Sequence, residues 1–112
     1  MVDLRAKPYC LTDTDIAWVE QTIAAMTDEE KVGQLFFDHS GKASDEQLRE
    51  MVRKYHLGGY RYNSIPSAQV QHQVRVLQEN SRIPMFVACN TETGGNGSGA
   101  DGTYIGSGIK IG

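Results

Sequence analysis

The chain has 112 residues, of which 39% are hydrophobic and 22% are charged, and its formal net charge is −3. This length and composition are those of one small soluble domain. The acidic balance argues against a general nucleic-acid surface, which would be basic. No apolar run approaches the roughly 18 residues that a transmembrane helix needs, and the N-terminal segment lacks the apolar core of a signal peptide. We therefore expect a cytoplasmic protein with no membrane or nucleic-acid partner. Two cysteines are too few for a disulfide scaffold.

Four helices are predicted from their starting residues and from apolar periodicity. Thr12 begins the sequence T-D-T-D, which is typical of a helix N-cap followed by an acidic first turn. Apolar residues at helical spacing then predict a helix over residues 14–26. The capping-box sequences T-D-E-E, from Thr27, and S-D-E-Q, from Ser44, start a short helical turn and a longer amphipathic helix. We expect His56 in the last turn of that helix, with the following pair of glycines stopping it. Ser67 is expected to cap a further helix that ends near residue 80.

Three short apolar or aromatic runs alternate with these helices, at residues 34–37, 60–63 and 84–89. The third run lies between a proline and a glycine-rich segment, which predicts a strand buried on both faces, with Cys89 in the core. The alternation of helices and strands predicts an α/β fold with parallel strands and right-handed crossovers. Residues 103–112 form a poor helix sequence because glycines interrupt β-branched residues. The pattern therefore stops where another helix is expected.

Asn90 and Glu92 directly follow the third predicted strand. In parallel α/β folds the ligand lies just beyond the carboxyl ends of the strands. Amide and carboxylate groups suit sugar hydroxyls, which both donate and accept hydrogen bonds. On the pattern alone, an equally weighted alternative is that both side chains satisfy loop backbone. The histidines and cysteines show no metal-ligand spacing, so we predict neither a metal nor a cofactor.

The segment from Gly97 to Gly102 matches G-x-G-x-x-G, which leaves a small phosphate- or nucleotide-binding module as an alternative function. That motif should directly follow a strand, open a helix and precede an acidic residue by about 20 positions. Here residues 90–96 intervene and no good helix follows. A flexible loop is the favoured interpretation. Asp101 either holds a turn within it or contacts a ligand, and the turn is favoured.

Three segments, in order and at matching spacing, resemble glycoside hydrolase family 3. They are M-T-D-E-E-K-V-G-Q-L-F at residues 26–36, G-G-Y-R-Y at residues 58–62, and the strand and loop I-P-M-F-V-A-C-N-T-E-T-G-G-N-G at residues 83–97. The segment D-G-T-Y-I-G, residues 101–106, fits the same loop in one branch of that family. The resemblance implies an α/β fold in the form of an incomplete (β/α)8 TIM-type barrel. Residues 1–112 would be the N-terminal portion of the barrel domain, its first three βα units with parallel strands.

The resemblance also implies an activity on β-linked carbohydrate. Family members retain anomeric configuration through a glycosyl-enzyme intermediate, and the likeness favours an exo-acting β-N-acetylhexosaminidase over a β-glucosidase. The family's nucleophile and acid/base lie on later segments, so no catalytic residue is predicted within these residues and the chain alone is expected to be inactive. A noncatalytic remnant is a further alternative, and the oligomeric state is left open.

The resemblance predicts Asn90 and Glu92 as substrate-binding residues. Asn90 falls where many members carry an aspartate that binds the nonreducing-end sugar, and Glu92 matches the family's glutamate. Thr93 is an extra residue before the paired glycines, and Asn96 stands where an arginine often follows them. Three strands of an otherwise closed barrel would leave two open edges, so we also expect marginal stability and a tendency to aggregate.

Overall fold

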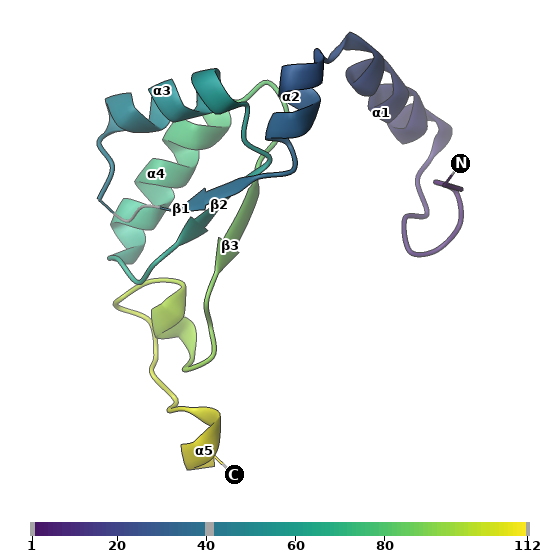
Figure 1. Cartoon of the computed structure of the whole chain (residues 1–112). Helices are drawn as coiled ribbons and strands as arrows, with labels where there is room; N and C mark the ends of the chain where they lie inside the picture. The colour runs from purple at the N-terminus through teal and green to yellow at the C-terminus, as the bar shows by residue number, and fades with distance from the viewer. Residues whose placement is uncertain (1, 40–41, 112) are drawn as a thin grey trace.

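The structure is a computed structural model, and it describes residues 2–39 and 42–111. Three strands, β1 (Phe37–His39), β2 (Gly59–Tyr62) and β3 (Phe86–Cys89), form one parallel sheet in chain order (Figure 1). The helices are α1 (Asp13–Ala25), α2 (Asp28–Gly33), α3 (Asp45–Tyr55), α4 (Ser67–Asn80) and α5 (Gly108–Ile111), with a 3-10 turn, η1 (Gly95–Gly97). The predicted α/β fold with three parallel strands is confirmed.

Three of the helices begin where the sequence predicts, because their starting signals are local. Thr12, Thr27 and Ser44 each accept a hydrogen bond from the backbone N–H three residues later. In return, the side chain at that third position accepts a hydrogen bond from the backbone N–H of the capping residue. These reciprocal pairs are complete capping boxes, which satisfy N–H groups that a helix start would otherwise leave unpaired.

Two helix boundaries differ from the prediction. α3 ends at Tyr55, and His56 is its C-cap in the left-handed region, with φ of 51°. The helix therefore ends at His56 itself and before the two glycines. α4 begins with Ser67 as its first residue and Pro66 as its N-cap. Because Ser67 lies inside the helix, the prediction that it caps α4 is wrong. Pro66, the residue at the cap position, makes no side-chain hydrogen bond there.

Helices α3 and α4 cover one face of the sheet and form the core with it (Figure 1). On the sheet side, Tyr60 and Tyr62 are buried and their rings pack edge to face, with centroids 5.2 Å apart. The other buried members of this core are Leu48, Val52, Leu57, Val76, Leu77 and Met85. One polar side chain, Gln73, is also buried, and its Nε2 donates to the Ala43 carbonyl at 3.2 Å.

The prediction that the third strand is buried on both faces is wrong. β3 is an edge strand with one neighbour, β2, and Phe86, Val87 and Cys89 are exposed. Phe86 is 74% exposed and stacks on Phe37 at a centroid distance of 6.3 Å. Phe37 and Phe86 pair with opposite edges of Gly59. Since alternate residues of a strand face opposite sides, this aromatic pair lies on the sheet face that α3 and α4 do not cover.

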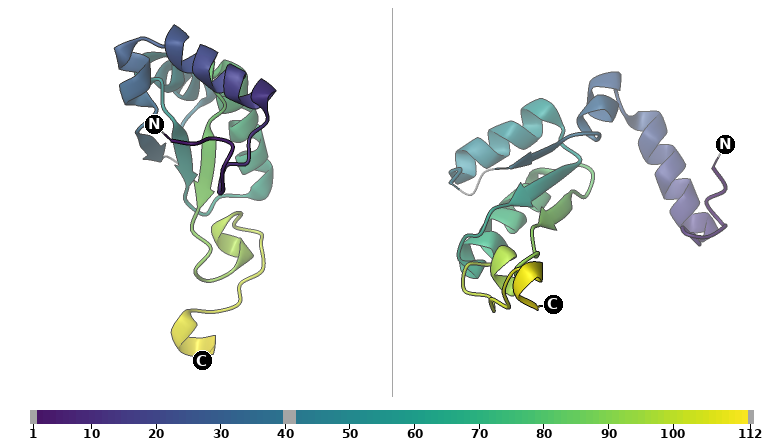
Figure 2. Two further views of the ribbon diagram at one scale, coloured as in Figure 1. Left: turned by 90° about the vertical axis from the view of Figure 1, so that its right-hand side faces the viewer. Right: turned by 60° about the horizontal axis from the view of Figure 1, so that its bottom comes forward.

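The chain as a whole is less compact than a closed domain of its size. α1 lies apart from the sheet and, of its thirteen residues, buries Ile16 alone (Figures 1 and 2). The radius of gyration is 16.9 Å, against about 13 Å for a compact domain of 100 residues. The accessible surface is 7884 Å², against about 6,100 Å² for a folded monomer of this mass.

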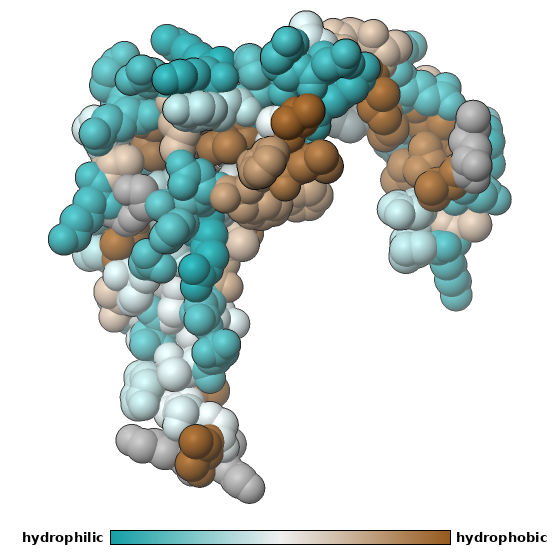
Figure 3. All heavy atoms as spheres, in the orientation of Figure 1, coloured by the Kyte–Doolittle hydropathy of each residue, from teal (hydrophilic) through white to brown (hydrophobic). Residues whose placement is uncertain are grey.

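Part of the excess surface is apolar. Figure 3 shows hydrophobic side chains gathered beside α2 and the start of β1. The large apolar residues exposed in this stretch are Val32, Leu35, Phe36 and Phe37. An exposed cluster of this kind marks a surface that other polypeptide commonly covers. None of the helices in the described part of the chain combines the length and apolar character that crossing a bilayer requires.

Candidate functional site

The carboxyl ends of β2 and β3 open into a cavity of about 250 Å³. Its lining consists of residues that end or follow these two strands: Arg61, Tyr62, Asn63, Ser64, Asn90, Glu92, Thr93, Asn96 and Gly97. The structure therefore brings both predicted site residues, Asn90 and Glu92, into one lining. The location is the one at which parallel α/β folds bind ligands.

Asn90 and Glu92 differ in what their side chains already contact. The Oδ1 atom of Asn90 accepts the backbone N–H of Glu92 at 3.0 Å. This oxygen holds the loop backbone, as the alternative interpretation of Asn90 expects, while its Nδ2 has no partner in the described residues. The carboxylate of Glu92 is exposed and likewise makes no hydrogen bond or ion pair within the described residues. Glu92 is thus the carboxylate that the cavity offers to a ligand.

Arg61 is a member of the cavity that the sequence prediction did not identify. It lies opposite His39 and Ala88 in the sheet. Its neighbours Tyr60 and Tyr62 are buried against the helices, so alternation places Arg61 on the open face. Within residues 2–39 and 42–111 its guanidinium group makes no hydrogen bond or ion pair, and it supplies the one positive charge of the described lining. The alternation in G-G-Y-R-Y places Arg61 on the other side of the strand from its tyrosine neighbours, but it does not say which side the helices cover.

The start of the glycine-rich segment packs closely at the cavity, with Asn96 and Gly97 in the lining. A Cβ atom on Gly97 would overlap the backbone carbonyl oxygen of Asn90, so the close approach of these two residues requires glycine. Ser64 Oγ donates to the Asn96 carbonyl at 2.6 Å, and Thr93 Oγ1 donates to Asn96 Oδ1 at 3.2 Å. These contacts fix the segment against the ends of β2 and β3.

The phosphate-binding alternative for the same segment loses its physical basis. A phosphate loop presents free backbone N–H groups to its ligand. Here the N–H groups already donate to protein carbonyls at five positions, which are Gly97, Ser98, Gly99, Ala100 and Gly102. The segment also begins within η1, and α5 starts only at Gly108. The geometry therefore does not resemble a strand, glycine turn and helix in direct succession.

Tyr62 contributes a buried phenol beside the cavity. The residue is 1% exposed, and its hydroxyl oxygen has no hydrogen-bond partner among the described residues. Burial, followed by the nearby Tyr60, raises the pKa of Tyr62 to about 12, because charge is costly away from water. The phenol is therefore protonated at neutral pH and cannot serve as an anion.

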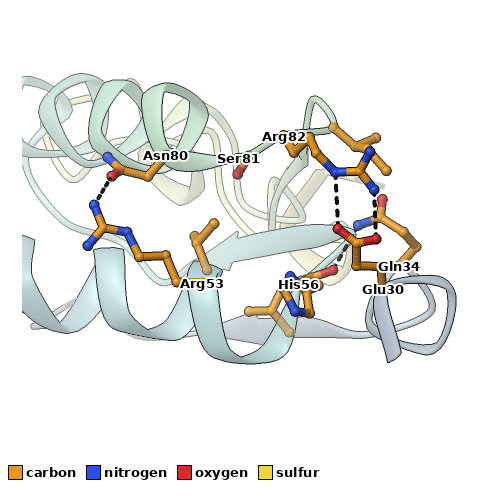
Figure 4. Close-up of a pocket in the computed structure, with 10 residues that line it drawn as sticks. Glu30, Gln34, Arg53, His56, Asn80, Ser81 and Arg82 are labelled. Carbon is orange, nitrogen blue, oxygen red and sulfur yellow. Dashed lines mark hydrogen bonds and ion pairs between the residues drawn. The ribbon is translucent and has the colours of Figure 1, made fainter. Parts of the chain in front are cut away.

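A second cavity, of about 220 Å³, lies among α2, the end of α3 and the segment before β3 (Figure 4). Arg82 contacts Glu30 through two nitrogens, Nε at 3.0 Å and Nη2 at 2.7 Å. The backbone N–H of Thr27 and then Arg82 hold the pKa of Glu30 below its ordinary value. Arg53 Nη2 donates to Asn80 Oδ1 at 3.2 Å. These polar groups already have protein partners. We therefore interpret the cavity as a structural contact between α2, α3 and the segment before β3.

The remaining chemically active residues do not assemble into a site. His39 is exposed at the end of β1, and His72 Nε2 contacts Asp45 Oδ1 at 2.9 Å on the surface. Cys10 and Cys89 are exposed free thiols, so the prediction that Cys89 lies in the core is wrong. Within the residues that the structure describes, no three His, Cys, Asp or Glu side chains are placed to hold a metal ion.

Known proteins give independent information on this arrangement. No family model matches the chain. A curated Beta-N-acetylglucosaminidase/beta-glucosidase from Cellulomonas fimi is 33% identical over 111 residues, which cover 99% of this chain and 20% of that protein. A solved structure of Beta-glucoside phosphorylase BglX bound to 2FGlc superposes with a TM-score of 0.81, and another of Beta-glucoside phosphorylase BglX with 0.77. Both are 34% identical; the match covers 90% of this chain and 19% and 18% of theirs.

The resemblance to glycoside hydrolase family 3 is confirmed. The three βα units match part of the barrel domain of such a protein, which confirms the predicted fold class. The chain spans about one fifth of the length of the curated and solved proteins that it matches.

Proposed function

We propose that this chain forms part of the sugar-binding end of a retaining glycosidase barrel that removes terminal β-linked N-acetylhexosamine. The observation that carries the proposal is the shared cavity of Asn90 and Glu92 at the carboxyl ends of parallel strands. The name of the Cellulomonas fimi relative, which includes Beta-N-acetylglucosaminidase, supports the substrate class. A carbohydrate substrate then needs no cofactor, because acid/base and nucleophilic chemistry suffice for glycosidic cleavage.

The chemistry of the cavity suits hydroxyl recognition. The Glu92 carboxylate accepts hydrogen bonds from sugar hydroxyls, and charge assistance strengthens them. Asn90 Nδ2 and the Arg61 guanidinium donate to hydroxyl oxygens. A retaining mechanism uses two carboxyl groups, one on each side of the scissile bond, whereas the described lining contains one. We therefore assign binding, and no catalytic step, to these residues and expect the 112-residue chain to be inactive alone.

A second candidate is the transfer of glucose from a β-glucoside to phosphate. The solved neighbours are named as β-glucoside phosphorylases, and the curated relative's name also includes beta-glucosidase. In such a reaction phosphate replaces water as the acceptor and must bind beside the sugar. A guanidinium group binds phosphate oxygens well, and Arg61 provides one without a partner in the described lining.

The test is a titration of the 15N-labelled chain with methyl N-acetyl-β-D-glucosaminide, methyl β-D-glucoside and inorganic phosphate, each followed by amide chemical shifts. We expect saturable shifts at residues 90–97 with the first sugar, and their loss in Glu92→Gln. Glu79→Gln removes an exposed carboxylate at the far end of α4 and should bind as the wild type does. Saturation by the glucoside together with phosphate shifts at Arg61 would favour the second candidate. Shifts that persist in Glu92→Gln, or none at all, would refute sugar binding in this cavity.

A further inference from the structure

Asp101 forms a contact that joins the glycine-rich segment to a distant helix. Its Oδ1 accepts the backbone N–H of Ser67 at 2.7 Å, and its Oδ2 accepts the Ser67 hydroxyl at 2.5 Å. Pro66, the N-cap of α4, offers no side-chain hydrogen bond. Asp101 therefore caps α4 from 34 residues further along the chain. These bonds to Ser67 also hold the pKa of Asp101 below its ordinary value.

Two further hydrogen bonds near this contact attach the glycine-rich segment to the segment between β2 and α4. The Ala100 N–H donates to the Ile65 carbonyl at 2.8 Å. Ser64 Oγ donates to the Asn96 carbonyl at 2.6 Å. The segment that links β2 to α4 thus holds the glycine-rich segment at both its beginning and its tip. Backbone groups and side chains share the attachment, and Asp101 makes two of its four hydrogen bonds.

The other side of the glycine-rich segment faces the cavity. Asn96 and Gly97 belong to the cavity lining, and Gly97 lies directly against the Asn90 carbonyl. Asn90 in turn orients the Glu92 backbone through its Oδ1. Asp101 is therefore joined through the short chain segment 97–101 to Gly97, which contacts Asn90, and Asn90 in turn contacts the Glu92 backbone. Asp101 is not itself in the lining, and both its carboxylate oxygens are already bonded to Ser67.

We propose that Asp101 is a positioning residue for sugar binding: by capping α4 it holds Asn96 and Gly97 against the exit of β3, and so fixes Asn90 and Glu92 in the cavity. This inference rests on the proposed function, since it assigns Asp101 a role in that same site. It differs from the turn that the sequence predicts for Asp101, because the side chain bonds a helix outside its own loop.

The experiment compares Asp101→Ala and Asp101→Asn in the full 112-residue chain by amide chemical shifts and hydrogen exchange. In Asp101→Ala we expect the signals of Asn96, Gly97 and Glu92 to move and the Ala100 amide to exchange about tenfold faster, as local opening becomes easier. Asparagine retains one acceptor oxygen for the Ser67 N–H, so Asp101→Asn should restore most of the wild-type signals. Affinity for methyl N-acetyl-β-D-glucosaminide should fall about tenfold in the alanine variant and recover in the asparagine variant.

Two further variants keep the test decisive. Ser67→Ala removes the hydroxyl bond and keeps the backbone bond, so it should give the same changes at smaller amplitude even if Asp101→Ala does not fold. Glu79→Ala alters charge on the same helix without contacting the segment, and it should change none of these signals. If the Gly97 and Glu92 signals keep their wild-type positions in Asp101→Ala, the positioning role is overturned, regardless of the affinity measured for the sugar. Failure of the wild-type chain to bind the sugar, with those signals displaced in the variant, would instead overturn the proposed function.

Discussion

Replacing Leu48 with alanine tests whether the core lies between α3, α4 and the sheet. The Leu48 side chain is fully buried, with 0% exposure, in the cluster that includes Tyr60 and Leu77. Buried Leu→Ala changes cost about 2–5 kcal/mol, and full burial places this one at about 3–5 kcal/mol. Domains have about 0.05–0.15 kcal/mol of stability per residue, so a chain of this length with an open sheet face should have roughly 6 kcal/mol. The substitution should therefore remove half of the free energy of unfolding or more.

Urea unfolding followed by circular dichroism measures this loss. With a denaturant slope of about 1.5 kcal/mol per molar urea, a 3 kcal/mol loss lowers the midpoint by about 2 M. Leu35→Ala is the matched control, because it deletes the same atoms from a side chain that is 80% exposed. Its effect should stay within about 0.5 kcal/mol. Repeating the measurement at several protein concentrations separates unfolding from self-association.

The reasoning would be refuted if Leu48→Ala cost less than about 1 kcal/mol, or if Leu35→Ala cost as much as Leu48→Ala. A small cost for Leu48→Ala would mean that the core described above does not stabilise the chain, and a large cost for Leu35→Ala would mean that the exposed patch beside α2 is buried in solution.

Three other substitutions probe separate features. Tyr62→Phe should raise the free energy of unfolding by about 1 kcal/mol in urea melts, because it removes a buried hydroxyl that has no partner in the described structure; a loss of stability would indicate a hidden partner. Gly58→Ala should sharply reduce the folded fraction, since its Cβ would overlap the Gln34 carbonyl oxygen, whereas Gly108→Ala meets nothing within 4 Å and should be tolerated; equal melting temperatures would contradict this. Glu30→Gln should lower the urea midpoint at pH 7. The Glu30 pKa is lowered from 4.5 in the folded chain, so its stabilisation is present above that value and is lost as the pH falls through the folded pKa. The two midpoints should therefore converge as the pH falls below 4.5, and a constant gap would count against stabilisation by the Glu30 carboxylate.

Signals that act within four residues were readable from the sequence. The N-cap at Thr12 and the capping boxes at Thr27 and Ser44 formed as predicted, because each needs only residues three positions apart. The burial of β3 was not readable in the same way. An apolar run shows that both faces of a strand can be buried. Whether they are buried depends on which other elements pack against the strand. Phe86 and Cys89 therefore stay exposed in the described chain.

In the candidate site, too, the features set by local sequence were predicted, and those that depend on distant residues were missed. The position of Asn90 and Glu92 at a strand end followed from the pattern, and the structure places both in one cavity. The cap on α4 was missed because it is supplied across 34 residues, a separation that local rules do not cover. Arg61 was missed for a different reason. Its side of the sheet becomes evident only once Tyr60 and Tyr62 are known to face the helices.

The order of the strands has a consequence for how the chain acquires its structure. Each strand pairs with the one that immediately precedes it in the sequence, β2 with β1 and β3 with β2. The paired residues are 22 and 27 positions apart in the sequence, so each pairing closes a shorter loop than a pairing of β1 with β3 would. During synthesis, α3 and α4 have β2 to pack on before β3 has been made. The sheet can therefore grow from its N-terminal edge one unit at a time, and β3 is the last of the three described strands to be added.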